Sequence, residues 1–363
     1  MEFKAPVLRR FNEYQMLEDV FLENPRENEV RVRMAASGVC HSCVSVELGE
    51  QPDIPLPIIL GDEGAGVVEK VGPGCTSLRE GDHVILSWAP GCGRCRLCAS
   101  GRPALCENAS PFGMPDNSSR FYVSDEPVSH FGPSTYSPYV VVTETAAIKV
   151  TTKMPLDRAA LIGCAVTTGI GAVLNTAKVG VGESVAVFGC GGVGLNAIQG
   201  AALAGAHPVI AVDIEDSKLE VAREMGATIT INSANVDAVD AVRGNTSGGV
   251  DYAVLTVGII SVLEQALAAL RVAGTCVLVG APAQGQLAKV DPLHLLAGER
   301  RLVGSRYGSY NPQIAFPRLV DLYLSGKIKL DNLISHRYEL DQVNEASRNL
   351  VSGHDVRGMI LFD

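Results

Sequence analysis

The chain has 363 residues, more than a single hydrophobic core usually supports, so two domains are expected. An apolar fraction of 47%, 38 glycines and a charged fraction of 19% exclude a disordered or fibrous chain and fit a globular α/β enzyme. The formal net charge of −10 opposes association with nucleic acid or anionic membranes, so neither is an expected partner.

The first part of the chain, to about residue 150, is predicted to be mainly β. Short apolar or alternating runs at 29–33 and 83–86 are separated by glycine and proline turns. Residues 107–136 are rich in Asn, Ser, Pro and Asp, which predicts a long surface loop. The N-terminus lacks the apolar run of a signal peptide, and no later stretch reaches about 18 uncharged apolar residues, so a cytoplasmic location is expected.

From about residue 157 the pattern changes, because apolar runs begin to alternate with helical stretches. Strands are predicted at 184–188, 209–214, 252–257 and 275–279, and helices at 216–225 and 316–324. Such alternation predicts a doubly wound parallel sheet with helices on both faces. The closing apolar segment, 358–362, is expected to return to the first domain.

A glycine-rich turn follows the strand at 184–188. Gly189, Gly191 and Gly194 form G-x-G-x-x-G between that strand and a helix, the pattern that binds the pyrophosphate of a dinucleotide. Asp213, near the end of the next strand, can accept hydrogen bonds from a ribose and would repel a 2′-phosphate, which favours NAD over NADP. Gly192, Val193 and Lys218 are assigned to the same site. The alternative is a packing turn of any α/β protein.

Four cysteines crowd into a short segment at about 90–108. Cys92, Cys95, Cys98 and Cys106 have the spacing C-x2-C-x2-C-x7-C, and four thiolates on one loop can close a tetrahedral shell around zinc. A closed shell leaves no position for substrate, so this would be a structural zinc site. An iron–sulfur cluster and reactive thiols are the alternatives.

Together these motifs resemble the zinc-containing medium-chain alcohol dehydrogenase family. The matching segments are 38–42, 61–66, the four-cysteine lobe, 161–164 and the turn at 189–194. The long form of the chain is most similar to the glutathione- or mycothiol-dependent formaldehyde dehydrogenases and their bacterial alcohol dehydrogenase relatives. The resemblance implies a GroES-like catalytic domain at 1–156 and 301–363, a Rossmann NAD domain at 157–300, and a homodimer, with a tetramer possible.

The resemblance also implies the residues of an active site. Cys40, Asp62 and Cys164 stand at the positions of the catalytic zinc ligands, Glu63 matches a carboxylate near the metal, and Ser42 matches a proton relay. The positions expected to contact the cofactor are His41, Thr168, Val257, Ile259 and Arg357.

Two positions depart from the family pattern. Asp62 replaces a histidine ligand, and Cys43 replaces the aspartate that supports that histidine. Zinc can still bind through Cys40, Asp62 and Cys164, with Glu63 or Cys43 exchanging in, which predicts an NAD-dependent zinc alcohol dehydrogenase. The alternatives are a metal-free reductase of activated C=C or C=N bonds and an NAD-binding homologue without activity.

Overall fold

The computed structural model describes residues 1–362, which form two compact units. Unit 1 consists of Met1–Cys164 and the chain from Asn311 onward, and unit 2 of Ala165–Tyr310. The boundaries lie later in the chain than the expected 157 and 301. The reason is that α3 (Leu156–Leu161) packs on the sheet of unit 1, whereas β16 (Arg301–Gly304) is a strand of the sheet in unit 2.

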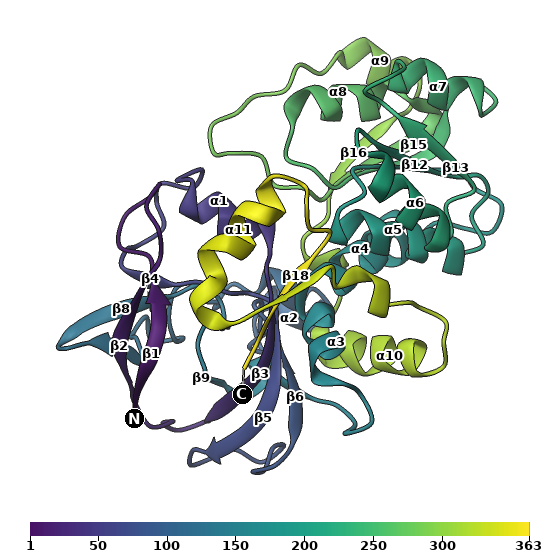
Figure 1. Ribbon diagram of the computed structural model, residues 1–363. Coiled ribbons are helices and arrows are strands. Elements are labelled where there is room, and N and C mark those ends of the chain that lie inside the picture. The colour runs from purple at the N-terminus through teal and green to yellow at the C-terminus, as the bar shows by residue number, and fades with distance from the viewer. Residues whose placement is uncertain (363) are drawn as a thin grey trace. The chain divides into compact units, whose positions relative to one another are not determined.

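Unit 1 is mainly β and contains two sheets (Figure 1). One has the order β1-β2-β7-β8-β4, and the other has the order β10-β6-β5-β3-β18-β17, with β9 also paired to β3. The strands are β1 (Glu2–Val7), β2 (Met16–Leu22), β3 (Glu29–Gly38), β4 (Ile58–Ile59), β5 (Gly64–Val71), β6 (His83–Leu86), β7 (Phe121–Val123), β8 (Glu126–His130), β9 (Tyr139–Thr143), β10 (Ala147–Lys149), β17 (His336–Tyr338) and β18 (Gly358–Leu361).

The core of unit 1 lies between these sheets. Val30, Val32 and Met34 of β3 are fully buried together with Phe121 and Val128 of the β7–β8 hairpin. The prediction of a loop throughout 107–136 was therefore wrong for residues 121–130. The polar composition of the segment concealed a short hairpin whose apolar side chains cover the core.

The C-terminal strand β18 pairs antiparallel with β3, as expected for a segment that returns to the first domain. Helix α11 (Val343–Val351) lies beside α1 (His41–Glu47) in Figure 1. The other helices of unit 1 are α2 (Arg96–Ala99) and α10 (Pro312–Leu324), with 3₁₀ turns η1 (Pro103–Leu105), η2 (Glu144–Ala146), η6 (Asp331–Leu333) and η7 (Leu340–Gln342).

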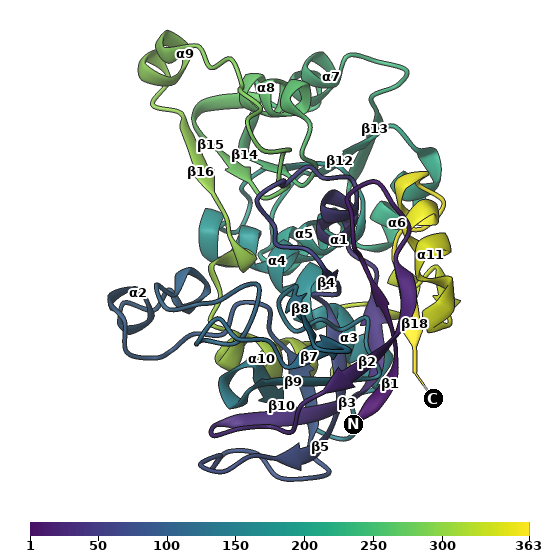
Figure 2. The ribbon, with the colours of Figure 1, turned by 90° about the vertical axis from the view of Figure 1, so that its left-hand side faces the viewer.

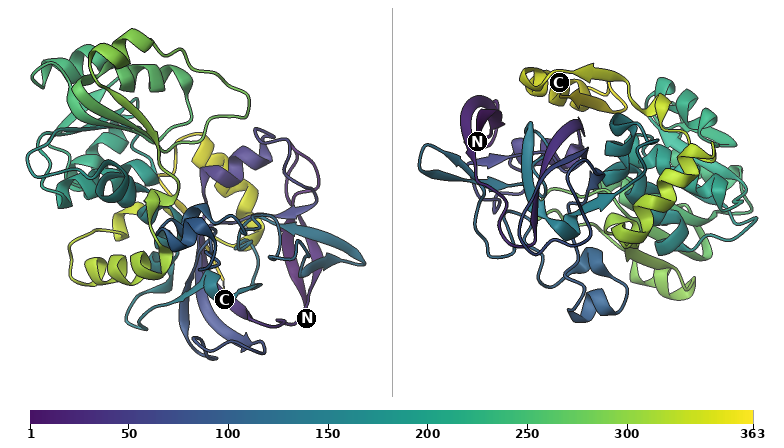
Figure 3. Two further views of the ribbon diagram at one scale, coloured as in Figure 1. Left: turned by 180° about the vertical axis from the view of Figure 1, so that it is seen from behind. Right: turned by 90° about the horizontal axis from the view of Figure 1, so that it is seen from below.

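Unit 2 contains a parallel sheet of order β13-β12-β11-β14-β15-β16. Helices α5 and α6 cover one face, and α7 and α8 cover the other (Figures 1 and 3). This doubly wound arrangement confirms the predicted fold class. The elements are α4 (Thr167–Gly171), η4 (Ala172–Ala177), β11 (Val185–Phe188), α5 (Gly192–Leu203), β12 (Val209–Asp213), α6 (Asp216–Glu224), β13 (Ile229–Asn232), α7 (Ala238–Gly244), β14 (Val250–Leu255), α8 (Ile260–Ala268), β15 (Leu270–Leu278), α9 (Pro292–Ala297), β16 and η5 (Tyr307–Ser309).

One helical run, Leu156–Ala177, has the length and apolarity of a membrane span, contrary to the expectation from sequence. Within its most apolar window, however, 83% is buried inside the protein. A core helix of a soluble protein passes the same test, so this run is weak support for a membrane location.

Candidate functional site

Cys40, Asp62 and Cys164 come from three separate segments of unit 1. Cys40 is the residue that precedes α1, Asp62 lies in the loop between β4 and β5, and Cys164 lies on the π-helical turn η3 (Ile162–Val166). Gly163 allows this turn to approach the sheet, because a Cβ at this position would lie 3.0 Å from the backbone oxygen of Leu86. Single-turn π segments occur frequently at functional sites.

These three residues bring two sulfurs and a carboxylate oxygen within 4.8 Å of one another. The Cys40 and Cys164 sulfurs are 3.9 Å apart, and the Cys164 sulfur is 3.8 Å from Asp62 Oδ2. Two sulfurs bound to one tetrahedral zinc would be about 3.8 Å apart, given Zn–S bonds of about 2.3 Å. The donor set and its spacing therefore fit a zinc ion, although the sequence departs from the usual histidine.

Burial dominates the electrostatics of this cluster. Burial raises the pKa of Asp62 to about 7, and the nearby Cys40 thiolate adds to the effect. A hydrogen bond from Cys164, together with the positive charge of Arg357, lowers the pKa of Cys40, while the pKa of Cys164 is raised. One thiolate therefore forms readily, whereas full ionisation of the three groups needs a cation.

Glu63 and Arg357 form a buried ion pair beside the cluster. Arg357 is 3% exposed; its Nε lies 3.5 Å from Glu63 Oε1 and its Nη1 donates to the Val39 carbonyl at 2.8 Å. Gly38 makes room for this carboxylate, because a Cβ there would lie 2.2 Å from Glu63 Oε1. The predicted role of Arg357 at a pyrophosphate stays a prediction, since its guanidinium here serves Glu63 and Val39.

Ser42 and Cys43 hold the two oxygens of Asp62. The Ser42 hydroxyl donates to Oδ2 at 2.5 Å, and the Cys43 thiol donates to Oδ1 at 3.9 Å. Cys43 is fully buried, and burial, followed by the charge of Asp62, raises the pKa of its thiol. Ser42 therefore directs its proton to the carboxylate, and Cys43 stays a neutral thiol.

Cys92, Cys95, Cys98 and Cys106 form a second cluster within 4.8 Å. The Cys95 and Cys106 sulfurs are 4.0 Å apart, and the backbone N–H groups of Cys95 and Cys98 point at the sulfurs three residues before them, at 3.4 Å. Backbone N–H groups of Arg94 and Cys95 lower the pKa of Cys92 to about 6. Four thiols supplied with N–H donors fit the predicted structural zinc. Figure 2 shows the lobe around α2.

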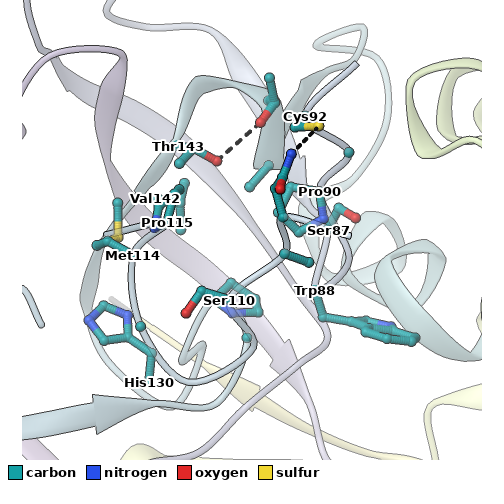
Figure 4. Close-up of a pocket in the computed structure, with 18 of the residues that line it drawn as sticks. Ser87, Trp88, Pro90, Cys92, Ser110, Met114, Pro115, His130, Val142 and Thr143 are labelled. Atoms are coloured by element: carbon teal, nitrogen blue, oxygen red, sulfur yellow. Dashed lines mark hydrogen bonds between the residues drawn. The ribbon is translucent and has the colours of Figure 1, made fainter. Parts of the chain in front are cut away.

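A cavity of about 280 Å³ lies beside this lobe (Figure 4). Asn108 on its wall donates to the Cys92 sulfur at 3.3 Å. His130 also lines it, and burial and the charge of Arg120 lower the pKa of its imidazole to about 3. The cavity is therefore lined by a neutral imidazole and contains none of the predicted catalytic residues.

In unit 2 the glycine turn has the geometry of a dinucleotide site. Gly189 has a φ of +94°, and a Cβ on Gly194 would lie 1.8 Å from the Gly189 carbonyl oxygen. A Cβ on Gly191, by contrast, would meet open space at the start of α5. Asp213 ends β12, and its Oδ2 accepts from the Cys190 N–H at 2.6 Å. The open approach at Gly191 fits a pyrophosphate.

The remaining predicted cofactor residues are placed as follows. In unit 2, the Thr168 hydroxyl is buried and has no hydrogen-bond partner among the described residues, as expected of a group that awaits a ligand. Val257 lies against the turn, because its Cγ1 would be 2.6 Å from a Cβ on Gly189. Ile259 is 55% exposed and precedes α8.

The other residues assigned to the cofactor lie at the starts of helices or within them. Gly192 and Val193 begin α5, and Lys218 lies in α6. His41 begins α1 on the surface of unit 1.

Comparison with known proteins agrees with these features. The alcohol dehydrogenase GroES-like domain family matches residues 26–152, and the zinc-binding dehydrogenase family matches residues 192–325. The chain is 40% identical over 346 residues to an S-(hydroxymethyl)glutathione dehydrogenase of Photobacterium damsela, covering 93% of this chain and 94% of the relative. It is also 40% identical over 359 residues to a class-3 alcohol dehydrogenase of Cereibacter sphaeroides, covering 95% of each. The chain belongs to the zinc-containing medium-chain alcohol dehydrogenase family.

Solved structures of the family agree. Benzyl alcohol dehydrogenase from Acinetobacter calcoaceticus has a TM-score of 0.94 at 34% identity, covering 100% of both chains. The protein is thus an oxidoreductase that acts on CH–OH groups, and zinc and NAD are the cofactors of its family.

The sequence analysis missed a residue that supports the glycine turn of this dehydrogenase. The Thr256 hydroxyl lies at 3.1 Å from the Phe188 carbonyl oxygen and 2.9 Å from that of Gly189, so it is placed to hold the turn in position. A polar residue directly after the strand beside the glycine turn is a signal that could have identified it.

Proposed function

We propose that this chain is an NAD-dependent dehydrogenase that acts on a CH2OH group and whose catalytic zinc is held by Cys40, Asp62 and Cys164. The observation that carries the proposal is the buried group of two sulfurs and one carboxylate oxygen within 4.8 Å. A zinc ion bound there would act as a Lewis acid toward the substrate oxygen. With three protein donors rather than the four of the cysteine lobe, the cluster resembles a catalytic site and not a closed structural one.

Other residues of the chain are assigned to NAD binding and to proton transfer. The turn at Gly189–Gly194 binds the NAD pyrophosphate, and Asp213 accepts hydrogen bonds from the ribose, with Lys218 nearby. Thr168, Val257 and Ile259 orient the nicotinamide, and His41 approaches the pyrophosphate of NAD. Arg357, which was expected at the pyrophosphate too, is instead held by Glu63 and Val39. Ser42 relays the proton of the alcohol toward solvent or the cofactor hydroxyls, and its hydrogen bond to Asp62 Oδ2 at 2.5 Å holds its hydroxyl beside the ligand carboxylate.

An aspartate at position 62, in place of histidine, should slow the oxidation of the alcohol. Two thiolates and a carboxylate carry more negative charge than two thiolates and an imidazole, so a metal held by this donor set would polarise the alcohol less. Glu63 adds another carboxylate, and Arg357 offsets part of the charge. We expect slower alcohol oxidation than in an enzyme with histidine at this position.

Zinc per chain and NAD-linked turnover, measured for wild type and Asp62→Ala, test this proposal. We expect about two zinc ions per chain to fall to about one, with loss of turnover. Asp82→Ala removes another buried carboxylate of unit 1 outside the cluster and should keep both ions. One zinc in wild type and variant alike would contradict the proposal and favour metal-free reduction.

The substrate is proposed to carry a CH2OH group, because relatives are named for S-(hydroxymethyl)glutathione, a hemithioacetal, and for benzyl alcohol, which both carry one. A panel of these two compounds with ethanol and 2-butanol tests the class. A higher kcat/KM on 2-butanol than on any of the three CH2OH compounds would contradict it.

We also propose a homodimer in the cytoplasm. Strand β16 ends the sheet of unit 2, and Leu302 on it and Leu293 and Leu296 on α9 are 37%, 67% and 78% exposed, a combination that favours pairing with a second copy. All ten cysteines are free, which a reducing compartment preserves. Light scattering, which measures the molar mass in solution, tests the dimer. We expect the mass of a dimer for wild type and a lower mass for Leu302→Lys. An unchanged mass in the variant would contradict pairing along β16.

A further inference from the structure

The two carboxylate oxygens of Asp62 have different neighbours. Oδ2 accepts from the Ser42 hydroxyl at 2.5 Å and faces the Cys164 sulfur at 3.8 Å. Oδ1 faces the Cys43 sulfur at 3.9 Å. Cys43 does not belong to the group whose ligand atoms lie mutually within 4.8 Å. It therefore contacts the carboxylate from outside the cluster.

Cys43 is fixed in this position by its helix and its surroundings. It lies in the first turn of α1, and its N–H donates to the Cys40 carbonyl at 3.1 Å. Its side chain is fully buried in a hydrophobic cluster with Val39, Val44 and Leu60. Its polar neighbours include Asp62, the Tyr136 hydroxyl and the backbone of Gly61. A side chain so enclosed has little freedom to turn toward the metal position.

We propose that Cys43 is a positioning residue for Asp62, whose thiol donates to Oδ1 and leaves Oδ2 as the single oxygen available to the metal. The proposal rests on the proposed function, in which Asp62 is a ligand. A carboxylate without a partner on its second oxygen can rotate or bind a metal through both oxygens. Hydrogen-bond partners of metal ligands orient the ligand, and their loss typically costs about 10–100-fold in metal affinity.

The same geometry makes the residues at 43 and 62 interdependent. A carboxylate at 43 would stand against the Asp62 carboxylate in a buried site, where like charges repel strongly. Against an imidazole at 62, however, a carboxylate at 43 would accept the second ring N–H. A thiol therefore suits an aspartate ligand, and a carboxylate suits a histidine ligand.

The first test compares cobalt-substituted wild type with Cys43→Ala and Cys43→Ser by visible absorption and by competitive metal titration. We expect Cys43→Ala to lower the affinity for the inner metal about 10–100-fold and to shift the d–d absorption bands of cobalt. The reason is that Asp62 becomes free to bind through both oxygens. Cys43→Ser keeps a donor on a shorter side chain that lies farther from Oδ1 than the 3.9 Å of the thiol, so we expect it to bind the inner metal with an affinity between those of wild type and Cys43→Ala. Cys276→Ala, which removes a fully buried thiol of unit 2, is the control and should change neither.

The second test is the exchange of both residues. Cys43→Asp alone should lose the inner metal, and Cys43→Asp with Asp62→His should regain it. Additive effects of the two substitutions, or wild-type spectrum and affinity in Cys43→Ala, would overturn the positioning role. Inner metal retained in Asp62→Ala would instead refute the proposed function itself, so the two failures are distinguishable.

Discussion

Glu47 is a half-buried carboxylate whose side-chain hydrogen-bond partners are neutral. It is the last residue of α1, and its Oε1 accepts from Gln15 Nε2 at 2.7 Å and from the Ser347 hydroxyl at 2.9 Å. Burial raises the pKa of Glu47 from 4.5 to about 7, although both hydrogen bonds oppose the rise. Ionised Glu47 therefore destabilises the fold.

The direction of the pH dependence follows from this shift. The folded-state pKa lies above the unfolded one, so the contribution of Glu47 is fully favourable below about pH 4.5 and is lost as the pH rises toward about 7. The difference between 4.5 and about 7, at about 1.36 kcal/mol per pH unit, corresponds to about 3 kcal/mol. Glu47→Gln keeps an acceptor oxygen and removes the charge. It should therefore leave stability unchanged near pH 4.5 and raise it by up to about 3 kcal/mol above pH 7.

Urea unfolding of wild type and Glu47→Gln at several pH values between 4.5 and 8 measures this difference. Glu80→Gln changes an exposed carboxylate of the same unit and serves as the control, with a difference near zero at every pH. A stability difference for Glu47→Gln that is the same at pH 5 and pH 8 would refute the argument from burial.

Two further predictions concern the lobe and the glycine turn. Cys98→Ser should release one zinc per chain and make the lobe sensitive to trypsin, as measured by metal analysis and limited proteolysis, whereas Cys75→Ser, outside the lobe, should change neither. Gly191→Val should weaken NAD binding at least about tenfold with little change in melting temperature, because its Cβ would enter the open approach to the turn. Gly194→Ala should lower the melting temperature, because its Cβ would lie 1.8 Å from the Gly189 carbonyl oxygen; equal melting temperatures for these two variants would contradict this account of the turn.

Features that depend on local spacing could be predicted from the sequence. The four-cysteine lobe and the glycine turn each occupy a short segment, so their spacing alone fixes which atoms can meet. The doubly wound fold was predictable for a similar reason, because strands and helices alternate along the chain. The cluster of Cys40, Asp62 and Cys164 was different, since its residues are far apart in sequence and were identified through the family resemblance.

Features that depend on tertiary packing could not be predicted. The β7–β8 hairpin lies in a segment of polar composition, and its strands are recognisable once Phe121 and Val128 are seen to be buried. The partner of Arg120 is another case, because its guanidinium binds Glu29, which is 91 residues away, through two hydrogen bonds in the core. Unit 2 extends past 301 because β16, a strand of four residues that begins with Arg301, joins the sheet by pairing with β15, and so short a strand cannot be recognised without its partner.

The charges of the inner cluster bear on the choice between a metal site and a metal-free site. Cys40, Cys164, Asp62 and Glu63 can each carry a negative charge, and all four are at most 7% exposed, whereas Arg357 brings one positive charge. Burial of so many acidic groups without a cation is costly, and here Asp62 and Cys164 respond with raised pKa values. A divalent ion would replace their protons and bring the group close to neutrality. A site devoted to hydride transfer without metal has no need of this arrangement, so the energetics favour the zinc dehydrogenase over the metal-free reductase.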